Sequence, residues 1–156
     1  MSSLNANPVV FDVREEDDRR IWSPVANEEE TEPLDVNEVF DIIRNINDPE
    51  HPYTLEQLNV TQRSLIAVDG SAVSVQFTPT IPHCEMATLI GLCLRVKLMR
   101  SLPARCKVDI RITPGTHAQE HQVNKQLNDK ERVAAALEKP NLLAMVNQCL
   151  RSHQEH

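Results

Sequence analysis

Residues 72–101 read AVSVQFTPTIPHCEMATLIGLCLRVKLMRS and contain the signals of a strand, a stiff loop and a long helix in succession. Over 72–77, valine and phenylalanine alternate with polar residues, which predicts a strand with one buried face. Over 85–101, apolar residues leave little polar surface, which predicts a helix that is buried on most sides. Pro79 and Pro82 stiffen the connection between the two elements. We therefore expect this helix to lie across a sheet that contains the strand.

The flanking segments add elements on both sides of this unit. Upstream, we expect a helix from about 34 to 46, one helical turn opened by a capping box at 54–57, and a strand over 63–68 that Asp69-Gly70 joins to the next strand. Downstream, the patterns predict a strand over 107–112 and helices over 116–127, 128–138 and 140–150, the first two opened by capping-box patterns.

The predicted order is α-β-β-α-β-α-α-α. It describes a single α+β domain with a small three-stranded mixed sheet covered by helices.

Charge divides the chain into an acidic arm and a nearly neutral body. Residues 1–33 hold nine acids and three bases, whereas the rest of the chain holds 14 acids and 13 bases. We expect 1–33 to be a flexible arm with two short apolar islands, 34–150 to be the folded domain and 151–156 to be a tail. A nearly neutral body gives no general attraction to nucleic acid or to anionic lipid.

The cysteines indicate reduced thiols in the cytosol or nucleus. Four are present, with wide and uneven spacing and no C-x-x-C pair, which argues against a self-contained zinc finger. The start of the chain lacks the basic and apolar blocks of a secretory signal, so a disulfide framework is not expected. No stretch approaches the length of a membrane span.

Cys84 is the main candidate functional residue. It stands at the predicted start of the long helix, where unpaired N–H groups and partial positive charge favour a thiolate. His83 beside it can supply or accept a proton, whereas Glu85 opposes the thiolate. The alternative is that Cys84 is a small buried packing residue. We expect structural roles for the other three thiols, those of Cys93, Cys106 and Cys149.

The segment 117–121 matches the pattern H-x-x-E-H, which some zinc peptidases use. Two histidines four residues apart share one helix face, so His117 and His121 could hold an ion together with Glu120. The alternatives are a solvated or capping pair and a non-catalytic metal-binding or interaction surface that faces Cys84. A hydrolase would need a third ligand and a substrate cleft, so we do not expect an enzyme.

A basic stretch extends from the second half of the long helix into the following strand. It includes Arg95, Arg100 and Arg105, and it lacks an aromatic platform for bases. We expect it to form a charged rim for a protein partner or for the acidic arm, without direct contact with nucleic acid. Asp48 and Glu50, in the proline-bounded loop, are further candidate partner-binding residues.

Several blocks resemble, in order, the eukaryotic SufT-like family and its B-type member, a subunit of the cytosolic iron–sulfur assembly targeting complex. They are DPEHP (48–52), LEQL (55–58), TPTIPHC (78–84), MATLIGL (86–92), RSLP (100–103), ITPGTH (112–117), KQL (125–127) and DKERVAAALE (129–138). The resemblance covers about residues 34–150.

The resemblance implies an adaptor that bridges a WD40 β-propeller subunit and a HEAT-repeat subunit. The assembly delivers [4Fe–4S] clusters to cytosolic and nuclear apoproteins, including enzymes of DNA replication and repair. The family's reactive cysteine corresponds to Cys84, family members also form homodimers, and no tightly bound cofactor is implied. One cysteine falls short of the four ligands that a cluster usually takes. Cys84 would therefore be a transient ligand or reactive thiol, and the alternative is a pure scaffold with a structural Cys84.

Overall fold

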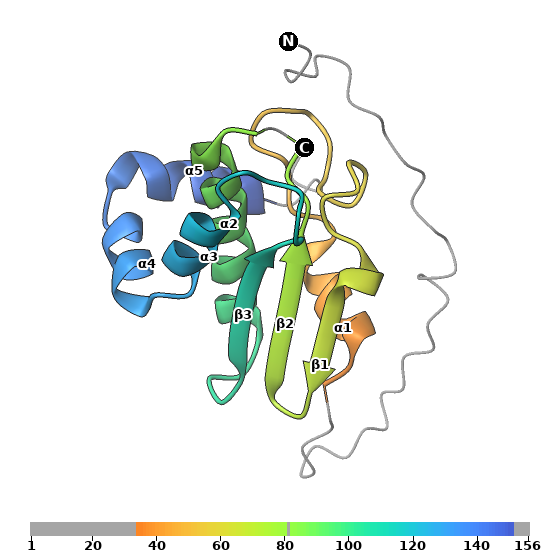
Figure 1. Cartoon of the computed structure of the whole chain (residues 1–156). Coiled ribbons are helices and arrows are strands. Elements are labelled where there is room, and N and C mark those ends of the chain that lie inside the picture. Colours follow the sequence, from red (N-terminus) through yellow and green to blue (C-terminus); the bar gives the residue numbers. More distant parts are fainter. Residues whose placement is uncertain (1–33, 81, 152–156) are drawn as a thin grey trace.

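The computed structural model describes residues 34–80 and 82–151 (Figure 1). The expectations for the acidic arm and for the end of the tail lie outside these residues. The elements are α1 (Val36–Ile43), a 3₁₀ helix (Arg63–Leu65), β1 (Ile66–Asp69), β2 (Ala72–Phe77), α2 (Cys84–Ser101), β3 (Lys107–Ile112), α3 (Glu120–Leu127), α4 (Lys130–Leu137) and α5 (Pro140–Leu150). This order confirms the predicted α+β fold.

The sheet is mixed, as predicted, with the strand order β1-β2-β3. β1 and β2 form an antiparallel hairpin in which Asp69 pairs with Ala72, and Gly70 takes a φ of 63° in the connection. β2 and β3 are parallel, with Phe77 opposite Ile112. Since α2 connects two parallel strands, it forms the crossover helix of a βαβ unit. The last residues of β2 and β3 therefore lie at the same edge of the sheet.

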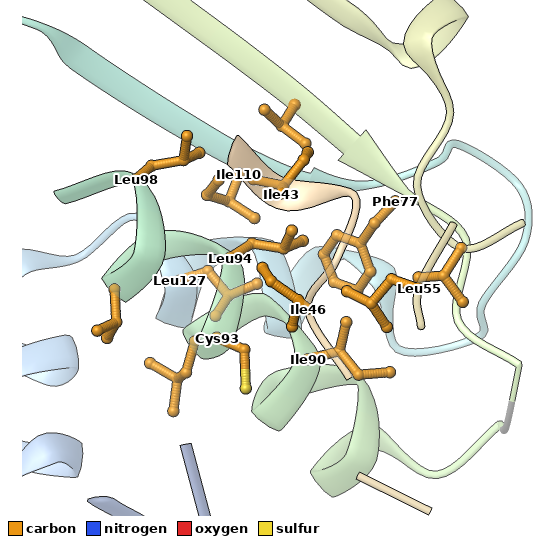
Figure 2. Packing of buried hydrophobic residues seen from close by; sticks show 14 of the residues in the cluster. Ile43, Ile46, Leu55, Phe77, Ile90, Cys93, Leu94, Leu98, Ile110 and Leu127 are labelled. Atoms are coloured by element: carbon orange, nitrogen blue, oxygen red, sulfur yellow. The ribbon is translucent and has the colours of Figure 1, made fainter. Parts of the chain in front are cut away.

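The core lies between the sheet and the helices. The alternation in β2 buries Val73, Val75 and Phe77, and α2 is buried along most of its length. Figure 1 shows α1 and α2 behind the sheet, and Figure 2 shows Ile110 of β3 among side chains of α1, α2 and α3. Leu94, in the middle of α2, is fully buried in this cluster. The prediction of a long helix across the sheet is confirmed.

Three sequence-based boundaries were wrong. The predicted strand 63–68 begins as a 3₁₀ helix and becomes a strand at Ile66, where pairing with β2 starts. The first helix ends at Ile43 rather than near 46, because the chain turns there toward the proline-bounded loop. The helix predicted from 116 begins at Glu120. The capping-box bonds predicted at 54–57 are present, between Thr54 and Gln57, but the segment forms a turn.

The free edge of β3 is covered by the side chains of Asn124, in α3, and of Asn128, the C-cap residue of that helix. Asn124 Oδ1 accepts the Ile112 N–H at 2.8 Å. Asn128 accepts the Ile110 N–H at 3.1 Å and donates to the Ile110 carbonyl at 2.8 Å. These amides replace the hydrogen bonds of a further strand, so the edge does not offer a template for pairing with another chain. Among the described residues, no helix combines the length and the hydropathy needed to span a membrane.

Candidate functional site

Cys84 is exposed and is the first residue of α2. The N-cap residue, His83, is also exposed, and its side chain makes no capping hydrogen bond. The N–H groups of the first helical turn therefore lie next to the thiol without a side-chain cap from His83. The alternative in which Cys84 packs in the interior is wrong for this structure, because the helix buries its later turns and leaves its first residue in solvent.

The parallel pairing of β2 and β3 brings two loops to one edge of the sheet. One loop runs from Thr78 to the start of α2, and the other runs from Thr113 to the start of α3. The Thr78 and Thr113 hydroxyl oxygens lie 2.8 Å apart and share a hydrogen bond, and the Thr113 N–H donates to the Phe77 carbonyl at 2.8 Å. The loop that leads to Cys84 and the loop that contains His117 therefore start side by side (Figure 1).

His117 is half-buried in the second loop. Its Nδ1 accepts the Gln119 N–H at 2.9 Å, so a neutral ring carries its proton on Nε2. That Nε2 is buried and has no hydrogen-bond partner in the part of the chain that the structure describes. A buried N–H without an acceptor is uncommon in folded proteins. The Nε2–H of His117 is therefore a buried donor without an acceptor among the described residues.

The prediction that His117 and His121 share a helix face is wrong. His117 precedes α3, and Glu120, the first residue of that helix, accepts the Gly115 N–H at 2.9 Å. The predicted capping box at 116–119 is also absent, since the Thr116 hydroxyl donates to the Thr113 carbonyl. His121 is exposed. Within residues 34–80 and 82–151, no three histidine, cysteine or acidic side chains are grouped to hold a metal ion.

Cys93 and Cys149 form a buried thiol pair between α2 and α5 (Cys93 is labelled in Figure 2). A hydrogen bond with Cys149, together with burial, raises the pKa of Cys93 well above its ordinary value of 9.0. The same hydrogen bond lowers the pKa of Cys149, against the opposing effect of burial. This environment suits the structural role expected for both residues, although sequence reasoning missed the pairing itself. Cys106 is half-buried before β3.

The candidate partner-binding arginines differ in environment. Arg95 donates to the Val108 carbonyl and to Asn128 Oδ1, so this guanidinium holds α2 to β3 and α3. Burial lowers the pKa of Arg95, and Asp109 opposes the shift. These bonds give Arg95 a role inside the fold, and its role in partner binding stays a prediction. Arg100 and Arg105 are exposed, and their role in partner binding stays a prediction.

Asp48 and Glu50 also differ. Glu50 is exposed, whereas Asp48 is buried and its Oδ1 accepts the N–H groups of Glu50 and His51 at 2.7 and 3.0 Å. The D-P-E-H spacing signals this turn, because an aspartate commonly accepts backbone N–H groups two and three residues ahead. An ion pair behind the loop joins Arg44 to Glu56 at 3.0 Å. Burial opposes the charge on Arg44, but the bonds to Glu56 and Asp41 outweigh it and raise its pKa.

Comparison with known proteins defines the class of this chain. The sequence model of a family described as "Iron-sulfur cluster assembly protein" matches residues 37–110. "Cytosolic iron-sulfur assembly component 2B" of Mus musculus is 60% identical over 148 residues, which cover 94% of this chain and 90% of the mouse protein. "Protein AE7" of Arabidopsis thaliana is 56% identical over 153 residues, with 97% of each chain covered.

A third relative has a name that includes that of its family. "MIP18 family protein galla-2" of Drosophila melanogaster is 58% identical over 148 residues, with 94% of each chain covered. These alignments span almost the whole chain at high identity. The chain belongs to the MIP18 family of cytosolic iron–sulfur assembly components, which confirms the resemblance found in the sequence.

Proposed function

We propose that this chain is a non-catalytic adaptor that delivers [4Fe–4S] clusters to cytosolic and nuclear apoproteins. Its family membership supports a role in cytosolic iron–sulfur assembly. The main observation in support of cluster handling is that the Cys84 thiol is exposed at the first position of α2. A solvent-exposed cysteine beside uncapped helix N–H groups is suited to act as a thiolate toward a soft metal centre.

The cluster is the cargo in this proposal. Cys84 supplies one thiolate, and a [4Fe–4S] cluster usually takes four. The remaining ligands would come from partner subunits or from the receiving apoprotein. The buried Nε2–H of His117 supports the proposal, because a hydrogen bond to a thiolate or a bridging sulfide would satisfy this donor. Such bonds to sulfur also tune the cluster.

The partners of the proposal are a WD40 β-propeller subunit and a HEAT-repeat subunit, as the family resemblance implies. The exposed residues Glu50, Arg100 and Arg105 are the candidates to contact them. His83, Glu120 and His121 would support the thiol or its partner surface. We further propose that the chain acts in the cytoplasm and the nucleus, where clients of DNA replication and repair reside, and that homodimers form one of its assembly states.

Substitution of Cys84 by serine tests the proposal. Because Cys84 is exposed, C84S should change the free energy of unfolding by no more than about 0.5 kcal/mol. The variant should still copurify with the partner subunits, while radiolabelled iron in client proteins falls to background in cells that express it in place of the normal chain. Cys106→Ser is the matched control and should leave client iron unchanged. Normal client iron with C84S would reject cluster handling by Cys84 and leave a scaffold.

A further inference from the structure

A second feature lies away from the thiol, between the proline-bounded loop and α5. A pocket of about 580 Å³ is lined there by Asn47, Asp48, Pro49, Pro52 and Met145, among others. This volume is within the range of ligand-binding pockets, about 300–1,000 Å³. We propose that this pocket binds an arginine side chain of a partner protein. The inference deepens the proposed adaptor function, on which it rests, by naming the chemistry that one partner presents.

Asp48 is the acidic residue among those that line the pocket. Its side chain is 2% exposed. Oδ1 has two backbone donors, whereas Oδ2 is buried and has no hydrogen-bond partner among the described residues. His51 Nδ1 lies 3.3 Å from the same oxygen, Oδ1. A buried carboxylate oxygen without a donor is unfavourable, and an incoming donor would remove that penalty.

Asn47 provides a second acceptor next to Asp48 in the chain. Its Oδ1 is also buried without a partner within residues 34–80 and 82–151, while its Nδ2 donates to the Arg151 carbonyl at 2.9 Å. The backbone is fixed at the same place, because the Asn47 N–H donates to the Cys149 carbonyl and the Asp48 N–H to the Tyr53 carbonyl. The two acceptors are therefore held on one rigid wall that joins the loop to α5.

Charge and shape favour a guanidinium group over other donors. A guanidinium carries five N–H groups in a plane, is weakly hydrated and places its flat faces against apolar groups. The rim supplies such groups through Pro49, Pro52 and Met145, and Met145 is 42% exposed. A large exposed apolar side chain beside an acidic wall fits a protein partner better than a free inorganic cation.

The test is a titration of the full chain, followed by amide NMR shifts. The probes are N-acetyl-arginine amide, its lysine counterpart and its citrulline counterpart, which has nearly the shape of arginine without the charge. We expect saturable shifts at residues 47–52 and 145–149 with the arginine probe, and binding at least about tenfold weaker for the other two. No shifts there at tens of millimolar, or equal shifts with lysine or citrulline, would overturn the proposal.

Asp48→Asn is the matched variant, because asparagine keeps one oxygen for the N–H groups of Glu50 and His51 and replaces Oδ2 by a donor. It should weaken arginine binding at least about tenfold, whereas Glu131→Gln, with the same charge change at an exposed residue outside the pocket, should not. Met145→Ala lies on the exposed rim and should weaken binding several-fold even if D48N does not fold. Unchanged binding in M145A and D48N would count against the pocket. Client iron in C84S reports separately on the proposed function.

Discussion

The cysteines of this chain show how position decides what one kind of side chain does. Cys84 and Cys93 lie on the same helix, nine residues apart. The first precedes the buried part of α2 and is exposed, whereas the second is fully buried against α5. An exposed thiol at a helix start can react or bind a metal, while a buried thiol held by a second thiol contributes to packing. Of these two cysteines, only Cys84 is placed to act as a reactive thiol or metal ligand.

The buried thiol pair predicts a loss of stability at alkaline pH. In the unfolded chain both thiols ionise near pH 9, whereas in the folded chain Cys93 keeps its proton because its pKa is raised. The lowered pKa of Cys149 adds a small gain in stability as pH approaches 9 from below. Above pH 9 the unfolded chain binds fewer protons than the folded chain, in which Cys93 is still protonated. This difference should lower the unfolding free energy by about 1.4 kcal/mol per pH unit.

Urea unfolding between pH 7 and pH 10.5 measures this effect. The double variant Cys93→Ala/Cys149→Ala should be less stable overall but should lose the additional alkaline slope. Cys106→Ala leaves the pair intact and should keep the slope of the normal chain. Parallel pH profiles for the normal chain and the double variant would contradict the assignment.

At the scale of elements, α3 stabilises the sheet through side-chain amides. Asn124 is 9% exposed and accepts the buried Ile112 N–H. Asn124→Ala would leave that N–H without a partner, so we expect a loss of about 1–3 kcal/mol in the free energy of unfolding. Gln122→Ala changes an exposed residue of the same helix and should stay within about 0.5 kcal/mol. Denaturant titrations compare the two, and equal stability of both variants would disprove the edge-capping role.

The elements also show what the sequence could predict. β2 and β3 were predicted with the bounds that the structure has, because apolar and polar residues alternate over six positions, a pattern that indicates a strand. α2 and α5 were also clear, since apolar residues on most sides mark α2 and a proline at the first turn marks α5. The start of α3 was predicted wrongly. There the Thr116 hydroxyl bonds back to Thr113 and His117 accepts a local N–H, a turn that the capping pattern alone does not reveal.

At the scale of the whole molecule, the parallel sheet decides which loops meet. The sequence singled out Cys84 and His117 separately, but only the pairing of β2 with β3 shows that their loops start at one edge. The sequence also could not predict the pairing of Cys93 with Cys149 or the pocket beside Asp48. Each joins segments tens of residues apart that carry no shared local pattern.

The central claim is that Cys84 handles the cluster that the assembly delivers. It is tested most directly by brief anaerobic alkylation of the assembled complex, with and without bound [4Fe–4S] cluster, followed by mass spectrometry of each cysteine. Without cluster, Cys84 should react faster than the buried Cys93 and Cys149. With cluster, Cys84 should be protected while Cys106 reacts as before. Equal alkylation of Cys84 in loaded and unloaded complexes would contradict the claim.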